Sequence, residues 1–429
     1  MKRTICLILI CIMMVSIIGC GKPSDTTNSN GTVTLKLGLP GGKTVTNPEI
    51  VERFKAKYPN IKLEIDETPW SDFKKKLKMQ VATSNAPATF IVDSGYAAAL
   101  GGMGALVDLT DRVNRDLNAE EYSVALTAGR DAQGHLWGVP HDLNSVAIYY
   151  NKKIFDEANL PYPDENWTYE EMFEMAKKMT KDLDGDGKTD QYGFCSLNNI
   201  TAGWLPFVTA NGGAPLDETR TKSMFKDPKT IEGIRRYIEP VQTGISPGME
   251  WTAANGGGIA AFYMGKVGML MGLSSAAKNI NANAPADFDY DVQMLPVGWD
   301  GERHCVYVPN HWTIFSRTSE AEQDAAWEWI KFYLSEEAQM LVADEFLAGY
   351  PIKNTALEYF NSKQSVPANT KVFIEGVEKY GVTLFENKTF EEWRPKVDTI
   401  TAQMFRGDIT FEEGINEIDK QVSEALLEE

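Results

Sequence analysis

The chain has 429 residues, of which 43% are hydrophobic, and its formal net charge is −18. This length is enough for two globular lobes, each with its own core. Because so acidic a chain repels phosphate backbones and has no clustered basic patch, we do not expect it to bind nucleic acid. Its four histidines form no H-x-x-H pattern or Cys/His array, which gives no support for a zinc or heme site.

The N-terminus has the pattern of a lipoprotein signal. Lys2 and Arg3 precede the apolar run 5–18, which is too short to span a bilayer. Ile17-Ile18-Gly19-Cys20 then resembles a lipobox, in which cleavage leaves the cysteine for diacylglycerol attachment. We expect residues 1–19 to be removed, Cys20 to be lipidated, and residues 20–32 to tether the protein to the outer face of a bacterial cell membrane. The alternative is an ordinary secretory signal with an incidental cysteine.

Two cysteines, Cys195 and Cys305, remain outside the signal and the lipidation position. Two are too few for a disulfide scaffold, and both lie among apolar residues, which favours buried free thiols. The sequence leaves open whether they pair.

Strands and helices alternate in the first hundred residues. Strands are predicted at 33–39, 61–65 and 89–92, with helices at 47–58 and 71–82 between them. This alternation is typical of a largely parallel α/β sheet, whose ligands gather beyond the carboxyl ends of the strands. Residues 40–43 and 93–96 would then lie on the ligand side. Asp93 is either a ligand contact or a helix N-cap.

The segment Gly134 to Phe155 organises the chain. Gly138 and Pro140 exclude a helix there, and Val146 to Tyr150 reads as a buried strand. One α/β unit precedes this segment and another follows it. We expect it to pass from one lobe to the other and to line the gap between them.

An acidic loop follows a helix that is predicted to start at Thr168 with a capping box. From Asp182 to Gln191, oxygen side chains alternate as at the start of an EF-hand, although Gly193 replaces the usual twelfth-position glutamate. We predict a structural calcium site. Its expected ligands are Asp182, Asp184, Asp186, the Lys188 carbonyl, Asp190 and Gln191. An exposed acidic turn is the alternative.

Later elements include helices at 230–243, 320–334 and about 391–407, and strands at 267–271 and 290–296. Trp251 is expected in a polar, glycine-rich loop. The aromatic residues of 320–334 have core spacing, and the lysine run 74–76 reads as a solvated helix face.

Several short segments together resemble the family 1 extracellular solute-binding proteins, the sugar-binding lipoproteins of ABC importers. They are Gly138-Val139-Pro140, Tyr149 to Phe155, Ala210 to Gly213, Phe262 to Met269, Met294 to Gly298, and Gly407 with Thr410 to Glu413. Each segment alone is weakly specific, but their order along the chain is not. The likeness covers the mature chain from Val33 onward.

This resemblance implies a two-lobed α/β architecture, the type II periplasmic-binding-protein fold, with a hinge between the lobes. Lobe 1 would comprise 33–148 and 297–355, and lobe 2 would comprise 149–296 and 356–429. The chain would cross near Ile148, Pro296 and residue 355. The resemblance also implies a carbohydrate ligand, a permease partner and a monomer.

Sugars are held by flat aromatic rings and by side chains that hydrogen-bond hydroxyl groups. The resemblance implies that Lys43, Asp93 and Asn144 are polar contacts and that Trp204 and Trp393 are aromatic platforms. Further expected ligand-binding residues are His141, Trp251, Asn310 and Trp312, with Trp70 a weaker candidate. The family's tryptophan after the Met-rich strand is replaced here by Gly272-Leu273-Ser274, so one platform is missing. Tyr149 and Tyr150 are expected to pack in the hinge.

Two other classes of function stay open. A secreted glycosidase or lyase would share the aromatic residues and carboxylates, and would need two carboxyl groups about 5–10 Å apart. A binder of a polyamine, a peptide or an iron chelate would share the two-lobed fold. The tether and the order of the segments favour a binding protein without catalysis.

Overall fold

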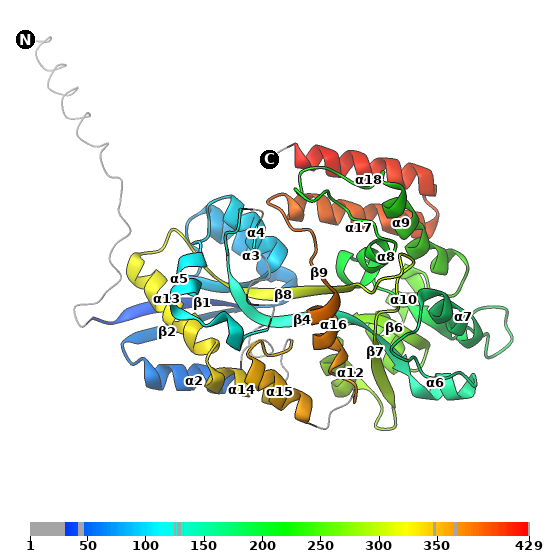
Figure 1. The fold of residues 1–429 in the computed structure, drawn as a ribbon, viewed down its shortest axis with the longest axis horizontal. Helices are drawn as coiled ribbons and strands as arrows, with labels where there is room; N and C mark the ends of the chain where they lie inside the picture. The colour runs from blue at the N-terminus through cyan, green and yellow to red at the C-terminus, as the bar shows by residue number, and fades with distance from the viewer. Residues whose placement is uncertain are drawn as a thin grey trace, which may run out of the picture.

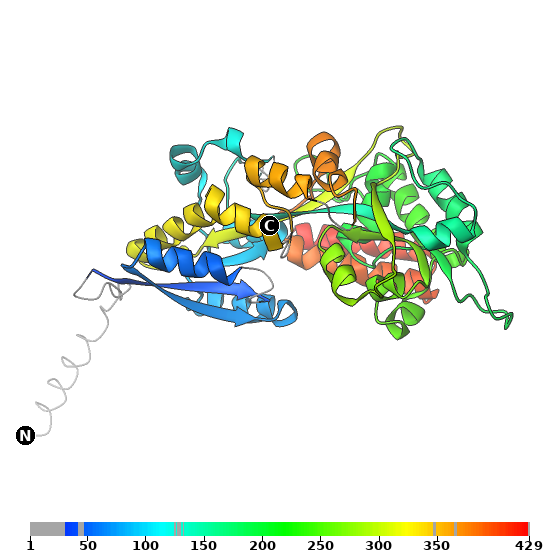
Figure 2. The same cartoon turned by 90° about the horizontal axis from the view of Figure 1, so that it is seen from below.

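The computed structural model describes residues 31–427, except 42–46, 124–125, 127–129, 132, 346–348 and 364–366. The predicted signal, Cys20 and Lys43 therefore lie outside the described residues. The molecule has two lobes joined in the middle by long strands, as Figure 1 shows from the side and Figure 2 from below. None of the helices described here is long and apolar enough to cross a membrane.

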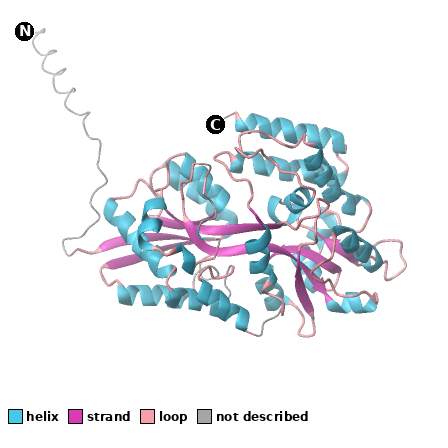
Figure 3. Ribbon diagram, viewed as in Figure 1, coloured by secondary structure: helices cyan, strands magenta, loops and turns pink. Residues whose placement is uncertain are grey.

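One mixed sheet runs through both lobes, with strand order β2-β1-β3-β8-β4-β6-β5; β7 pairs with β4, and β9 pairs with β8. Figure 3 shows these strands as a continuous band with helices above and below it. The strands are β1 (Val33–Pro40), β2 (Ile61–Thr68), β3 (Thr89–Asp93), β4 (Val139–Asn151), β5 (Tyr192–Cys195), β6 (Val267–Leu273), β7 (Tyr290–Met294), β8 (Cys305–Ile314) and β9 (Gly381–Val382).

The first lobe holds the strands β1 to β3, which pair in parallel as the alternation predicts. Its helices are α2 (Pro48–Lys57), α3 (Trp70–Ala82), α4 (Ser94–Gly102), α5 (Thr110–Asp116), α13 (Glu320–Tyr333) and α14 (Glu336–Glu345), with the short turn η2 (Ala119–Glu121). Asn47 caps α2 as expected, because its side chain accepts the Glu49 N–H at 2.7 Å.

The second lobe holds β5, β6 and β7. Its helices are α6 (Lys152–Glu157), α7 (Tyr169–Met179), α8 (Leu205–Ala210), α9 (Pro228–Gln242), α10 (Met249–Ala254), α11 (Gly258–Tyr263), α12 (Ala276–Asn283), α17 (Phe390–Arg406) and α18 (Phe411–Leu426), with the turn η4 (Ile200–Trp204). Both hydrogen bonds of the predicted capping box at Thr168 are present, and Gly407 ends α17 with φ 71°. Trp251 lies in α10 rather than in a loop, because the Gly248 carbonyl starts a helical turn there.

The strand β4 belongs to both lobes. Residues 139–145 pair with β8, whereas 146–151 pair with β6 and β7, and all thirteen residues are buried. Its antiparallel neighbour β8 follows Pro296 in the sequence and carries the chain back to the first lobe, where it pairs with β3. A third stretch runs past the same place, where Tyr350 and Leu143 exchange backbone hydrogen bonds. The lobe boundaries suggested by the sequence stay predictions.

Two helices, α15 (Asn354–Ser362) and α16 (Val372–Tyr380), follow this third stretch, and α16 packs against β4, β7 and β8. The largest apolar cluster runs from the first lobe across the shared strands, and it includes Tyr149 as expected. Trp329, Phe332 and Tyr333 of α13 are buried in it, which confirms their predicted packing role.

Cys195 and Cys305 are buried free thiols. Burial raises the pKa of each to about 12, so both are neutral at physiological pH.

Candidate functional site

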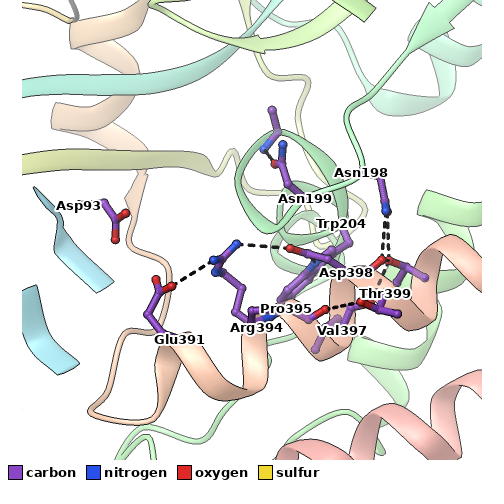
Figure 4. A network of polar contacts seen from close by, with 12 residues as sticks. Asp93, Asn198, Asn199, Trp204, Glu391, Arg394, Pro395, Val397, Asp398 and Thr399 are labelled. Carbon is purple, nitrogen blue, oxygen red and sulfur yellow. Dashed lines mark hydrogen bonds and ion pairs between the residues drawn. The ribbon is translucent and has the colours of Figure 1, made fainter. Parts of the chain in front are cut away.

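An ion-pair network joins the two lobes where α3 and α4 meet α17. The Lys74 ammonium on α3 lies 2.7 Å from Asp93 Oδ2 in the first lobe and 2.8 Å from Glu391 Oε1 in the second. Asp93 also caps α4, because its Oδ1 accepts the Tyr96 N–H at 2.9 Å. Figure 4 shows Asp93 facing Glu391 across the gap between the ribbons. The lobes are therefore in contact through charged side chains.

The network continues along one face of α17, whose i, i+3 and i+4 positions point the same way. Arg394 lies 3.4 Å from both Glu391 Oε2 and Asp398 Oδ2. Asp398 Oδ1 accepts the Trp204 indole N–H at 2.9 Å (Figure 4). The Arg394 Nε is buried, with no hydrogen-bond partner among the described residues.

Burial and charge act in opposite directions in this network. Burial is the largest single influence and would raise the pKa of Asp93, but the Lys74 ammonium, the Tyr96 N–H and Arg394 together lower that pKa. Burial would lower the pKa of Lys74, but the two carboxylates raise it. The pKa of Asp398 is raised, chiefly because it is buried. Three carboxylates and two cations thus share a partly desolvated space.

Polar side chains on three neighbouring strands extend the site toward the hinge. Asp93 on β3 lies opposite Asn310 on β8, whose Nδ2 donates to Asp142 Oδ1 on β4 at 2.8 Å. Asn144 Nδ2 donates to the same oxygen at 3.1 Å, and its Oδ1 accepts the Ser274 hydroxyl at 3.2 Å. Asn144 and Asn310 thus share one polar cluster through Asp142, and the backbone of Asn310 pairs with that of Asp93.

Two other predicted ligand contacts are core residues. His141 is 1% exposed, with Nδ1 2.8 Å from Asp142 Oδ2 and Nε2 2.8 Å from the Tyr333 hydroxyl. Trp312 is fully buried and packs edge-on against Trp329. The alternation of β4 and β8 turns both side chains toward α13, where they are buried, and their contact with a ligand stays a prediction.

The two expected aromatic platforms, Trp204 and Trp393, are also fully buried. Trp204 packs edge-on against Phe225, and its indole N–H alone reaches the ion-pair network. Trp393 packs against Phe390 and donates its N–H to Asn387 Oδ1 at 3.1 Å. Neither ring offers an open face in this structure, which differs from the expectation.

Trp251 is partly buried in the second lobe, edge-on to Tyr192. Trp70 begins α3, and Lys43 lies outside the described residues, so the structure does not test either side chain.

Several members of the network were not predicted from the sequence. Lys74 was expected on a solvated face, yet it joins the lobes. Glu391, Arg394 and Asp398 were not singled out, although their helical spacing around Trp393 is a readable signal.

A cavity between the lobes reveals one more missed residue. It has a volume of about 230 Å³ and lies between α4 and three other parts of the chain. These are residues 131, 133 and 137, residues 219–221, and residues 386–388. Trp137 lines it, and this tryptophan stands inside the segment that the sequence already marked as central.

Three carboxylates of the acidic loop come together as predicted. Oxygens of Asp182, Asp184 and Asp190 lie within 4.8 Å of one another. Hydrogen bonds from the Gly187 and Gly185 N–H groups lower the pKa of Asp182.

Two of the expected ligands do not join this cluster. Asp186 pairs with the ammonium of Lys188 at 3.3 Å. The buried Gln191 donates its amide to the Met179 carbonyl at 2.7 Å, which turns that group away from the loop. The donor set of the three remaining aspartates fits a hard cation such as Ca²⁺.

Solved structures share this architecture over nearly the whole chain. An ABC substrate-binding protein of Listeria monocytogenes, in complex with cycloalternan, has a TM-score of 0.81 and 20% identity, covering 92% of this chain and 99% of that one. The sugar-binding protein MalE of Xanthomonas citri has a TM-score of 0.78 and 17% identity, covering 92% and 98%. At these identities the likeness establishes the two-lobed fold.

Relatives in sequence are equally distant. The maltotriose-binding protein of Pyrococcus abyssi is 22% identical over 290 residues, 66% of this chain and 58% of its own. The sn-glycerol-3-phosphate-binding periplasmic protein of Escherichia coli K12 is 24% identical over 272 residues, 61% and 59%. Residues 42–340 match the sequence profile of the bacterial extracellular solute-binding proteins. The chain therefore belongs to the bacterial extracellular solute-binding proteins.

Proposed function

We propose that this protein captures a carbohydrate, specifically an oligosaccharide, between its lobes and delivers it to the permease of an ABC importer. The observation that supports this most is the network in which Lys74 links carboxylates of both lobes. A ligand that replaces these contacts with its own would hold the lobes together. Several distant relatives and structural neighbours are named for sugars.

The chemistry of the network suits hydroxyl groups. A carboxylate offers two acceptor oxygens, and amides such as Asn144 and Asn310 both donate and accept, which matches the vicinal hydroxyls of a sugar. Three carboxylates against two cations do not favour an anionic ligand such as a phosphate ester. The family consists of binding proteins, and we propose that the sugar leaves unchanged.

A panel of solutes tests this proposal by thermal shift, because a ligand that binds only the folded state raises the melting temperature by mass action. The panel contains malto-, cello- and xylo-oligosaccharides, sn-glycerol 3-phosphate, a polyamine, a peptide and an iron chelate. A shift with an oligosaccharide supports the proposal, and a shift with only the other solutes contradicts it. If incubation with an oligosaccharide releases reducing ends, the alternative of a secreted glycosidase is favoured.

A matched pair of variants locates the site. Asp93→Asn keeps a good helix cap but removes the charge, and we expect it to weaken sugar binding about tenfold. Asp227→Asn makes the same change at the cap of α9, where Asp227 accepts the Lys229 N–H at 2.9 Å. This control should bind like the wild type. Equal loss in both variants would contradict a site at Asp93.

We propose further that Cys20 carries lipid and tethers the protein to the membrane, on the strength of the lipobox-like sequence. Metabolic labelling with palmitate tests this. Label in the wild type that disappears in Cys20→Ser supports the anchor, and label in neither excludes it.

We propose that Asp182, Asp184 and Asp190 hold Ca²⁺, which would neutralise their mutual repulsion and fix the loop. Calcium added after chelation should raise the melting temperature of the wild type but not of Asp184→Asn. An unchanged melting temperature in the wild type would favour the alternative, an exposed acidic turn that binds no calcium.

A further inference from the structure

The cavity beside α4 is a candidate for a second ligand site. It is lined by residues of both lobes, so it is complete only when the lobes are in contact. The lining comprises Ala98, Gly102, Asp131, Gln133, Trp137, Thr219, Arg220, Thr221, Glu386, Asn387 and Lys388. Its volume of about 230 Å³ is below the roughly 300–1,000 Å³ of drug-sized pockets, so it suits a group the size of one ring.

Trp137 is held as a fixed aromatic surface in this cavity. Its ring packs on Gly101 so closely that a Cβ there would lie 2.2 Å from the indole. Its N–H donates to Asp131 Oδ2 at 3.0 Å, and the same oxygen is 2.8 Å from His135 Nδ1. The indole remains only partly buried. A rigid, partly exposed indole is the group that stacks on the apolar face of a sugar.

Polar groups of the second lobe are equally fixed. Glu386 is 5% exposed, and one of its oxygens accepts the Ser94 hydroxyl of the first lobe at 2.5 Å. The Arg220 guanidinium donates to the Glu386 carbonyl at 2.8 Å, and Asn387 Nδ2 donates to the Arg220 carbonyl at 2.9 Å. A buried carboxylate, an arginine and an amide thus line the cavity opposite Trp137.

The charges that line the cavity balance. Asp131 and Glu386 carry negative charge, and Arg220 and Lys388 carry positive charge. A balanced, polar and aromatic surface favours an uncharged ring with hydroxyl groups over an ion.

We propose that this cavity is an outer sugar subsite that binds the distal unit of an oligosaccharide whose first units lie at the ion-pair network. The inference rests on the proposed function. Helix α4 connects the two places, because Asp93 caps its start and Gly102 ends it. At 1.5 Å per residue, nine residues separate the two places by about 13 Å. Trp137 would then determine the preferred ligand length.

The proposal predicts how affinity depends on chain length. Calorimetry with malto-, cello- and xylo-oligosaccharides of two to six units measures it. One aromatic stack should improve affinity by about 3- to 10-fold between short and long members of the series that binds. Trp137→Ala should lose this gain and keep the affinity for the shortest ligand. Trp299→Ala, which removes a partly buried tryptophan that stacks on Tyr169 in the second lobe, should keep the gain.

A second variant addresses the risk that Trp137→Ala disturbs packing. Ala98→Phe fills the cavity from α4 without removing a contact, and it should also abolish the gain. A gain that persists in both variants overturns the outer subsite and leaves the proposed function intact. An equal loss for short and long ligands assigns these residues to lobe closure and also overturns it. If none of the malto-, cello- and xylo-oligosaccharides binds the wild type, the proposed function is contradicted, and so is the outer subsite that rests on it.

Discussion

Gly95 on α4 is the point at which one added methyl group should keep the lobes apart. A Cβ at this position would lie 2.3 Å from Cδ1 and 2.4 Å from Cε1 of Phe390, the first residue of α17. The ring cannot swing aside freely, because it is 1% exposed and packs at right angles on Trp393. Gly95→Ala therefore places a steric conflict between the lobes.

The magnitude follows from overpacking, which costs about 1–3 kcal/mol in a well-packed site. This cost is borne only while α4 and α17 are in contact. The affinity of a ligand that requires closure should therefore fall by roughly 5- to 150-fold, at 1.4 kcal/mol per factor of ten. Gly95 lies in a helix, where alanine is favoured over glycine by up to about 1 kcal/mol, so the stability of the unliganded protein should not fall.

Small-angle scattering and calorimetry check this reasoning together. The variant should show a larger radius of gyration without ligand and weaker binding of the sugar found in the panel. Adding Phe390→Ala should remove the conflict and restore the compact form. A variant with wild-type dimensions and affinity would refute the idea that this contact controls closure.

Three further outcomes are expected. Trp393→Ala should lower the free energy of unfolding by about 3–5 kcal/mol without ligand, because the ring is fully buried. Urea denaturation measures this change. An unchanged midpoint would contradict the buried position and favour an exposed ring that can stack on a sugar. Burial raises the pKa of Asp398 above its ordinary 3.8, so its contribution to stability is present below that value and is lost as the pH rises through the folded-state pKa. The stability of the wild type minus that of Asp398→Asn should therefore decline from pH 4 to pH 7, and a rising difference would contradict the sign. The thiols of Cys195 and Cys305, whose pKa burial raises to about 12, should not react with a thiol reagent at pH 8 until the protein unfolds; rapid labelling in the native state would contradict their burial.

Local signals in the sequence predicted much of the fold. Asn47, the Thr168 capping box and Gly407 mark helix ends through contacts within a few residues, and the structure contains all three. The buried strand after Gly134 was also predicted, because its apolar run needs no knowledge of its partners.

The site was harder to predict because it depends on contacts between distant segments. Lys74 and Glu391 are separated by 317 positions, and nothing near either residue indicates the other. Tryptophan content suggested platforms, but Trp204 and Trp393 show that composition does not say which ring faces the core. Asp93 is the helix cap that its sequence context allowed, and it also joins the ion-pair network, whereas its contact with a ligand stays a prediction.

The strand order carries a consequence for how the polypeptide reaches its native state. β8 lies between β3 and β4, yet it is made more than 150 residues after β4 ends. Until residue 314 has been synthesised, β3 has an open edge and the sheet of the N-terminal part cannot close. Neither part of the molecule is an autonomous folding unit, so a nascent chain of 300 residues should remain unfinished and vulnerable to edge-to-edge association.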